Sequence, residues 1–179
     1  MSKQALQDAK LEYGHKNIQL SEMYPVIQEV LQGGGTFRLT ITGCSMWPTI
    51  LGGRDQVTLS QPPQRLQKYD LPLYRRKSGQ FVLHRIVAVE EDGTYICCGD
   101  HQWQLEKGLR QEQMVGLATT LVRKGKTIDV TDRRYCRWVH FWVWMLPCRH
   151  AIFSVYRFFS RIGELARAAL RKVFFKKKK

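Results

Sequence analysis

The sequence has no long run of uncharged apolar residues. Nowhere in its 179 residues do about 18 such residues follow one another, so no ordinary transmembrane helix is expected. Residues 1–16 are polar and lack the apolar segment of a secretory signal, so we expect no such signal either. If the chain meets a membrane, these two absences predict that it does so at the surface.

The sequence also has few cysteines for a disulfide framework and no motif typical of a metal or phosphate site. Its five cysteines are odd in number and include the adjacent pair Cys97 and Cys98, which fits a reducing compartment. There is no Cys-x-x-Cys pair, and the glycines at 33–35 are not followed by Lys-Ser/Thr. We therefore expect neither a metal ion nor a cofactor.

Acidic residues are scarce in the last third of the chain. Residues 121–179 hold 16 Lys and Arg against 3 Asp and Glu, a net charge of +13, while the whole chain carries +14. The first 120 residues are therefore nearly neutral. Such an asymmetry favours an anionic partner for the C-terminal region, either membrane lipid or nucleic acid.

Short segments with strand character dominate the first 130 residues. Ser21 can cap a short helix that runs to about Gln32, and Phe37, Leu39 and Ile41 then alternate with polar residues as in a strand. Turn residues separate further candidate strands at 56–59, 71–75, 80–90, 94–98, 114–123 and 126–130. This pattern predicts a mainly β, partly closed domain at 36–130, preceded by an arm and helix at 1–35 and followed by a helical tail at 131–179.

The tail has two segments with helical character. Residues 138–146 are rich in aromatics and end at Pro147, and residues 150–175 carry apolar and basic side chains at helical spacing. The favoured interpretation is an amphipathic pair that lies on an anionic membrane surface, which places the protein peripherally, at the cytoplasmic face. The alternatives are a helix packed on the β domain or on a partner, and nucleic-acid binding, which is disfavoured because no recognisable binding module is present.

Ser45 and His84 are candidates for a catalytic nucleophile and its base. Ser45 precedes Met-x-Pro-Thr, where Pro48 prevents a regular strand and implies a sharp, exposed turn. His84 interrupts the otherwise apolar segment 81–87. A serine hydroxyl becomes a nucleophile when a neighbouring base takes its proton, and neutral imidazole suits that task near pH 7.

The surroundings of these two residues resemble the signal peptidase I superfamily of serine peptidases, whose fold is shared by the repressor-type self-cleaving peptidases. The resemblance covers roughly residues 36 to 125. Its five boxes occur here in order as Gly43–Thr49, Asp55–Val57, Asp70–Tyr74, Leu83–Val87 and Gly99–Asp100. Because His84 stands where most bacterial members have lysine, the chain is similar to the Ser/His branch. Tyr69 stands where the family usually has glycine.

The resemblance implies a serine endopeptidase without a cofactor that cleaves an extended precursor or signal peptide after small side chains. Ser45 would be the nucleophile, His84 the general base, and Asp100 the acid that orients the imidazole, with Glu106 as the alternative acid. The Ser45 backbone N–H would meet the oxyanion. The substrate backbone would pair with a strand edge.

Two other functions remain open from the sequence. The chain can be a catalytically inactive relative whose groove binds peptides, with the tail as its membrane anchor. It can also be a maturation peptidase that acts on a cytoplasmic precursor peptide, which the reducing cysteine pattern favours.

Overall fold

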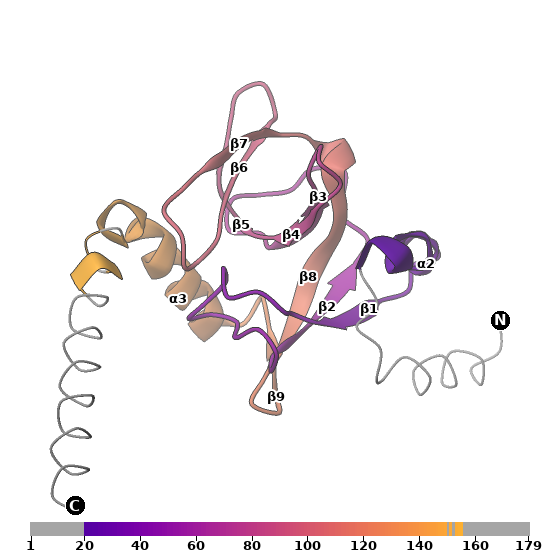
Figure 1. The fold of residues 1–179 in the computed structure, drawn as a ribbon, viewed down its shortest axis with the longest axis horizontal. Coiled ribbons are helices and arrows are strands. Elements are labelled where there is room, and N and C mark those ends of the chain that lie inside the picture. Colours follow the sequence, from indigo (N-terminus) through magenta and orange to yellow (C-terminus); the bar gives the residue numbers. More distant parts are fainter. Residues whose placement is uncertain (1–19, 150, 152, 156–179) are drawn as a thin grey trace, which may run out of the picture.

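The computed structural model describes residues 20–149, 151 and 153–155. The polar arm expected before the first helix, at residues 1–18, and most of the helix expected at 150–175 lie outside these residues. The described part is mainly β, with helix α2 before the strands and helix α3, followed by further short helical segments, after them (Figure 1). Its elements are α2 (Leu20–Gln32), β1 (Phe37–Thr40), β2 (Gln56–Ser60), β3 (Pro72–Arg75), β4 (Phe81–Leu83), β5 (Arg85–Val89), β6 (Tyr95–Cys98), β7 (Glu106–Leu109), β8 (Met114–Arg123), β9 (Lys126–Asp129) and α3 (Arg133–Trp144).

The strands form two antiparallel sheets that curl into a half-barrel (Figure 1). The larger sheet has the order β1-β2-β8-β3-β4, with β9 added on β8, and the smaller sheet has the order β5-β6-β7. The ten-residue β8 is the centre of the larger sheet, because it pairs with β2, β3 and β9. Strands β1 and β4 are the two ends of the larger sheet's order.

The strands predicted at 56–59, 71–75, 94–98, 114–123 and 126–130 are confirmed to within a residue at each end. The strand predicted at 80–90 is two strands, because β4 ends at Leu83 and β5 begins at Arg85. His84 alone separates them, so the chain passes from the larger sheet to the smaller one at this residue. β7 was not predicted, because its sequence, Glu-Lys-Gly-Leu, has no alternation of apolar residues.

The main core lies between α2 and the concave side of the larger sheet. Ile27 and Leu31, one turn apart on α2, are fully buried against Val57 and Leu59 of β2. Gly116 of β8 lets this contact form, since a Cβ there would meet Leu31 and Leu59 at 3.2 Å. The helix and the sheet are therefore packed tightly enough to hold β1 in place.

The segment between β1 and β2 carries Ser45 and is tied at its base. The Ile41 N–H donates to the Asp55 carbonyl at 3.1 Å, and the Gly53 N–H donates to the Ile41 carbonyl at 2.6 Å. The buried Asp55 carboxylate also accepts the Leu51 N–H at 2.9 Å. This loop is therefore a closed, hydrogen-bonded structure and not a loose connection.

Helix α3 packs on the smaller sheet. Val139 and Val143 are buried in one cluster with Val87, Ile96 and Cys98 of β5 and β6. Asp132 caps the helix by accepting the N–H groups of residues 134 and 135. One of the interpretations of residues 138–146 was a helix packed on the β domain, and one face of α3 packs in that way. Among the described residues, no helix has the length and apolar character needed to cross a bilayer.

A substitution at Gly52 tests how firmly the Ser45 loop is closed. A Cβ at Gly52 would lie 2.3 Å from the Gly43 carbonyl oxygen and 2.6 Å from that of Thr42, and these backbone atoms cannot swing away. We expect Gly52→Ala to lower the free energy of unfolding by about 1–3 kcal/mol, the usual range for overpacking. Urea denaturation measures it. Gly43→Ala is the matched control, because nothing lies within 4 Å of its Cβ, and equal stability of the two variants would contradict the prediction.

Candidate active site

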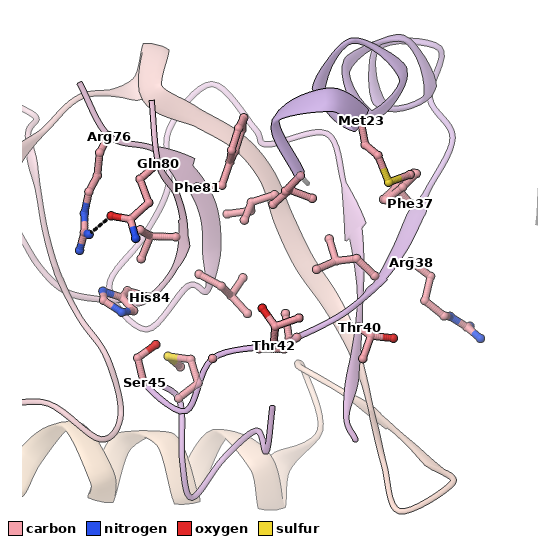
Figure 2. Close-up of a pocket in the computed structure, with 18 of the residues that line it drawn as sticks. Met23, Phe37, Arg38, Thr40, Thr42, Ser45, Arg76, Gln80, Phe81 and His84 are labelled. Carbon is pink, nitrogen blue, oxygen red and sulfur yellow. Dashed lines mark hydrogen bonds between the residues drawn. The ribbon is translucent and has the colours of Figure 1, made fainter. Parts of the chain in front are cut away.

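A cleft of about 860 Å³ opens between the two end strands of the larger sheet. Residues of β1 and β4 form its long sides, and Leu20 and Met23 of α2 lie at one end. Ser45 and His84 both line the cleft, and Figure 2 shows them at its other end, with Ser45 below His84. The structure thus brings together the two residues that the sequence singled out, from segments 39 positions apart.

Ser45 is half-buried at the start of a tight turn that carries two buried side chains. The Trp47 N–H donates to the Cys44 carbonyl at 3.1 Å, and the Ile50 N–H to the Met46 carbonyl at 2.9 Å. The side chains of Met46 and Ile50 are buried in the main core. On the far side of the chain, the Ser45 carbonyl accepts the His101 N–H at 2.7 Å. The backbone that carries the hydroxyl is therefore fixed from both directions.

His84 is buried, and its ring is held through one nitrogen. Nδ1 lies 3.2 Å from Oε1 of Glu106 and 3.3 Å from the Tyr74 hydroxyl. Because an ionised carboxylate can only accept hydrogen bonds, the neutral ring carries its proton on Nδ1 and keeps a lone pair on Nε2. That tautomer is the one a general base needs.

Glu106 is kept ionised by its neighbours. The Arg76 Nε donates to Oε2 at 2.8 Å, and the other end of the Arg76 fork pairs with Oε1. Burial would raise the pKa of Glu106, but the hydrogen bonds from Arg76 and Tyr74 and the Arg76 charge outweigh it, so the pKa lies below its usual value. Arg76 is itself held by Gln80, whose side-chain oxygen it meets at 2.5 Å (Figure 2).

The imidazole of His84 is kept neutral. Burial lowers its pKa below the usual 6.5, and the nearby Arg76 charge lowers it further. The Glu106 carboxylate opposes both effects but does not cancel them. His84 is therefore a free base at neutral pH, with a carboxylate in place to stabilise the imidazolium that forms when it accepts a proton.

Asp100 does not have the place that the sequence predicted for it. It is fully buried, and both of its carboxylate oxygens accept from Arg85, at 2.8 and 3.1 Å. Arg85 follows His84 directly, so its side chain lies on the opposite side of the chain and draws Asp100 away from the ring. Glu106, the alternative acid, is the carboxylate that contacts the imidazole.

The sequence also gave no role to Tyr74 and Arg76. Tyr74 lies on β3 and Arg76 directly follows this strand, and both side chains form hydrogen bonds with Glu106 on β7. The spacing of Arg76 and Glu106, 30 residues apart, carries no local signal. Tyr69 adopts a positive φ of 83°, which explains why glycine suits this position, and its ring packs against His140 of α3.

Comparisons with protein-family models, with curated proteins and with solved structures found no match to this chain. Among the described residues, no group of three or more His, Cys, Asp or Glu side chains is placed to hold a metal ion.

Titration of His84 by NMR tests these electrostatics without any assay of activity. We expect its pKa to lie below 6.5. Glu106→Gln should lower it further, because it removes the charge that favours the imidazolium, and Arg76→Gln should raise it, because it removes a repelling charge. Shifts of the same sign in both variants would contradict the arrangement.

Proposed function

We propose that this protein is a serine endopeptidase in which Ser45 is the nucleophile, His84 the general base and Glu106 the acid that orients the base. The observation that carries the proposal is that Ser45 and His84 line one cleft while the Nδ1 of His84 is held by an ionised carboxylate. The likeness of the five sequence boxes to the signal peptidase I superfamily supports the same function. Nucleophile, base and orienting group then have the relation that acyl-transfer sites require.

The reaction follows from the tautomer of His84. Nε2 takes the proton of the Ser45 hydroxyl as its oxygen attacks the carbonyl carbon of the scissile peptide bond. The imidazolium, stabilised by Glu106, then gives that proton to the departing amine as the C–N bond breaks, leaving an acyl-serine. Water attacks the ester in a second round, again losing its proton to Nε2, and the peptide's new carboxyl end is released as Ser45 regains its proton.

The form of the cleft favours an extended peptide as the substrate. A strand that enters between β1 and β4 lies beside the two end strands of the larger sheet, so it can add main-chain hydrogen bonds to that sheet. The Ser45 backbone N–H is the donor proposed for the oxyanion. Gly43, two residues earlier, has no side-chain donor to add.

Substitution and labelling test the proposal together. The wild-type protein should react with a fluorophosphonate, a probe that phosphonylates activated serines with loss of fluoride, and mass spectrometry should place the adduct on Ser45. Ser45→Ala and His84→Ala should each reduce peptide cleavage by on the order of 10³-fold or more, because residues that act as a unit fail together. Glu106→Gln should lose about 10²- to 10⁴-fold, since it leaves the base poorly oriented.

The variant Asp100→Asn distinguishes the role of Asp100 from the role proposed for Glu106. It should destabilise the fold by about 3–5 kcal/mol, because it leaves the buried charge of Arg85 without its partner. It should lower the pKa of His84 less than Glu106→Gln does, because the Asp100 charge favours the imidazolium less than the Glu106 charge does. Wild-type turnover by a Ser45→Ala variant would contradict the assignment of Ser45 as the nucleophile. A wild-type protein that binds peptides but never labels at Ser45 would instead be the inactive peptide-binding relative.

We further propose that the protein works at an anionic membrane surface through the solvent side of α3. Phe141 and Trp144 are 50% and 74% exposed, and Arg134 and Arg137 lie on the same side of the helix. Next to them, a hollow is lined by three arginines, His140, Cys136 and the helix-capping Asp132, so cations outnumber the single carboxylate. Exposed aromatic rings beside a cluster of arginines fit the headgroup layer of a membrane that contains acidic lipid.

Vesicle co-sedimentation of the full chain tests this surface. The protein should bind vesicles that contain acidic lipid, bind neutral ones far less, and be released by salt. Replacing both Arg134 and Arg137 with Gln should weaken binding by about 30-fold, at roughly 1 kcal/mol for each charge, and replacing Phe141 and Trp144 with Ser should weaken it as well.

The matched control removes two exposed charges at the other side of the domain, Lys107→Gln with Arg110→Gln, and should bind as the wild type does. Equal binding by the control and by both α3 variants would show that α3 is not the contact. Truncation before α3 is not a suitable test, because it would uncover the apolar cluster around Val139 and Val143.

A further inference from the structure

One turn lies directly behind the proposed nucleophile and is held from its far side by the C-terminal part of the chain. The Gly99–Gln102 turn follows β6 and is closed by the Gln102 N–H, which donates to the Gly99 carbonyl at 3.0 Å. Its His101 N–H is the group that donates to the Ser45 carbonyl at 2.7 Å. A Cβ at Gly99 would lie 2.6 Å from that same carbonyl oxygen, so turn and nucleophile backbone are in close contact.

The carbonyls of this turn face donors from outside the β domain. The indole N–H of Trp142, on α3, donates to the Asp100 carbonyl at 3.0 Å. One terminal nitrogen of Arg149, which lies after α3, meets the Gly99 carbonyl at 3.2 Å and the Gln102 carbonyl at 3.4 Å. The other terminal nitrogen donates to the Trp142 carbonyl at 2.6 Å, and the guanidinium lies 4.9 Å from the centre of the Trp142 ring.

Arg149 is unusual because it is an arginine whose side chain is buried against backbone carbonyls. Its side chain is 1% exposed, yet in the described residues no carboxylate pairs with it; its partners are backbone carbonyls. Burial of a cation without a directly paired carboxylate is costly, and burial lowers the pKa of Arg149, an effect that the nearby Asp100 charge opposes but does not cancel. A planar fork that spans three carbonyls is what a guanidinium supplies and an ammonium does not.

We infer that Arg149 and Trp142 are positioning residues for catalysis, which hold the Gly99–Gln102 turn where its His101 N–H fixes the backbone of Ser45. This inference rests on the proposed peptidase function and extends it to the C-terminal segment. Neither side chain touches substrate. They act through the turn, and a displacement of the nucleophile by about 1 Å is enough to lose on the order of 10²-fold in rate.

The test uses Arg149→Lys, which keeps the charge, and Trp142→Phe, which keeps the ring but removes the donor. Both should lower kcat by about 10- to 100-fold with KM within a factor of about two, because the cleft at β1 and β4 is unchanged. The acidic limb of the pH profile should not move, since neither residue contacts His84. Arg65→Lys, at an exposed arginine in a loop, is the control and should behave as the wild type.

Hydrogen exchange of the same proteins, followed by mass spectrometry, gives a readout that needs no activity. In both variants, exchange should rise in peptides that cover 44–50 and 99–102, while β2 and β8 stay as protected as in the wild type. Wild-type kcat together with wild-type exchange in both segments would overturn the inference. So would a general rise that includes β2 and β8, because it would mean that Arg149 only stabilises the fold.

The two proposals fail in different ways. If Ser45 of the wild type does not react with the fluorophosphonate, the peptidase function fails, whatever the exchange shows. If Ser45 reacts in the wild type and equally fast in Arg149→Lys, the function stands and the positioning role fails.

Discussion

The buried ion pair between Arg85 and Asp100 is the interaction on which the rest of the structure depends. Burial would lower the pKa of Arg85, but the Asp100 carboxylate more than offsets this and keeps the guanidinium charged. The same guanidinium donates to the Tyr69 carbonyl at 3.2 Å and to the Tyr135 hydroxyl of α3. One side chain thus joins β5, the Gly99–Gln102 turn, the loop before β3 and the C-terminal helix. Because a buried charge that loses its partner is costly, this pair fixes the positions of the four elements relative to one another in the finished fold.

Some parts of this fold and site could be predicted from the sequence, and the partner choice of Arg85 decides one that could not. Most strands could be located because apolar residues alternate with polar ones and turn residues separate the segments. Ser45 could be singled out because it precedes a turn at Pro48, and His84 because it interrupts an apolar segment. The carboxylate that contacts His84 could not be identified in the same way. Asp100 and Glu106 both follow β6, and the choice between them depends on a register in which Cys97 pairs with Ile86 on one side and with Glu106 on the other. That register brings Glu106 to the strand end beside His84, while Arg85 takes Asp100. An arginine next to His84 was the available sign that Asp100, the nearer carboxylate in the sequence, had another partner.

Helix α3 shows why a basic and aromatic segment is hard to interpret from its composition. Its aromatic residues do different things: Trp142 donates to the Asp100 carbonyl, Trp138 stacks on Trp142 at 5.2 Å and reaches the Thr49 hydroxyl, and Trp144 faces solvent. Only the three-dimensional arrangement separates the rings that support the Ser45 loop from those that remain for a partner. The same helix can therefore be part of the domain on one side and a binding surface on the other.

The late place of Arg149 in the chain has a consequence for biosynthesis. Ser45, His84 and Glu106 are all translated before α3 and Arg149, and domains begin to fold from the N-terminal side while synthesis continues. The half-barrel can form first, but the turn behind Ser45 receives its last hydrogen bonds only when residue 149 has left the ribosome. A nascent chain would then hold Ser45, His84 and Glu106 without the final alignment, and the proposed peptidase site would be completed only after nearly all of the described fold has been made.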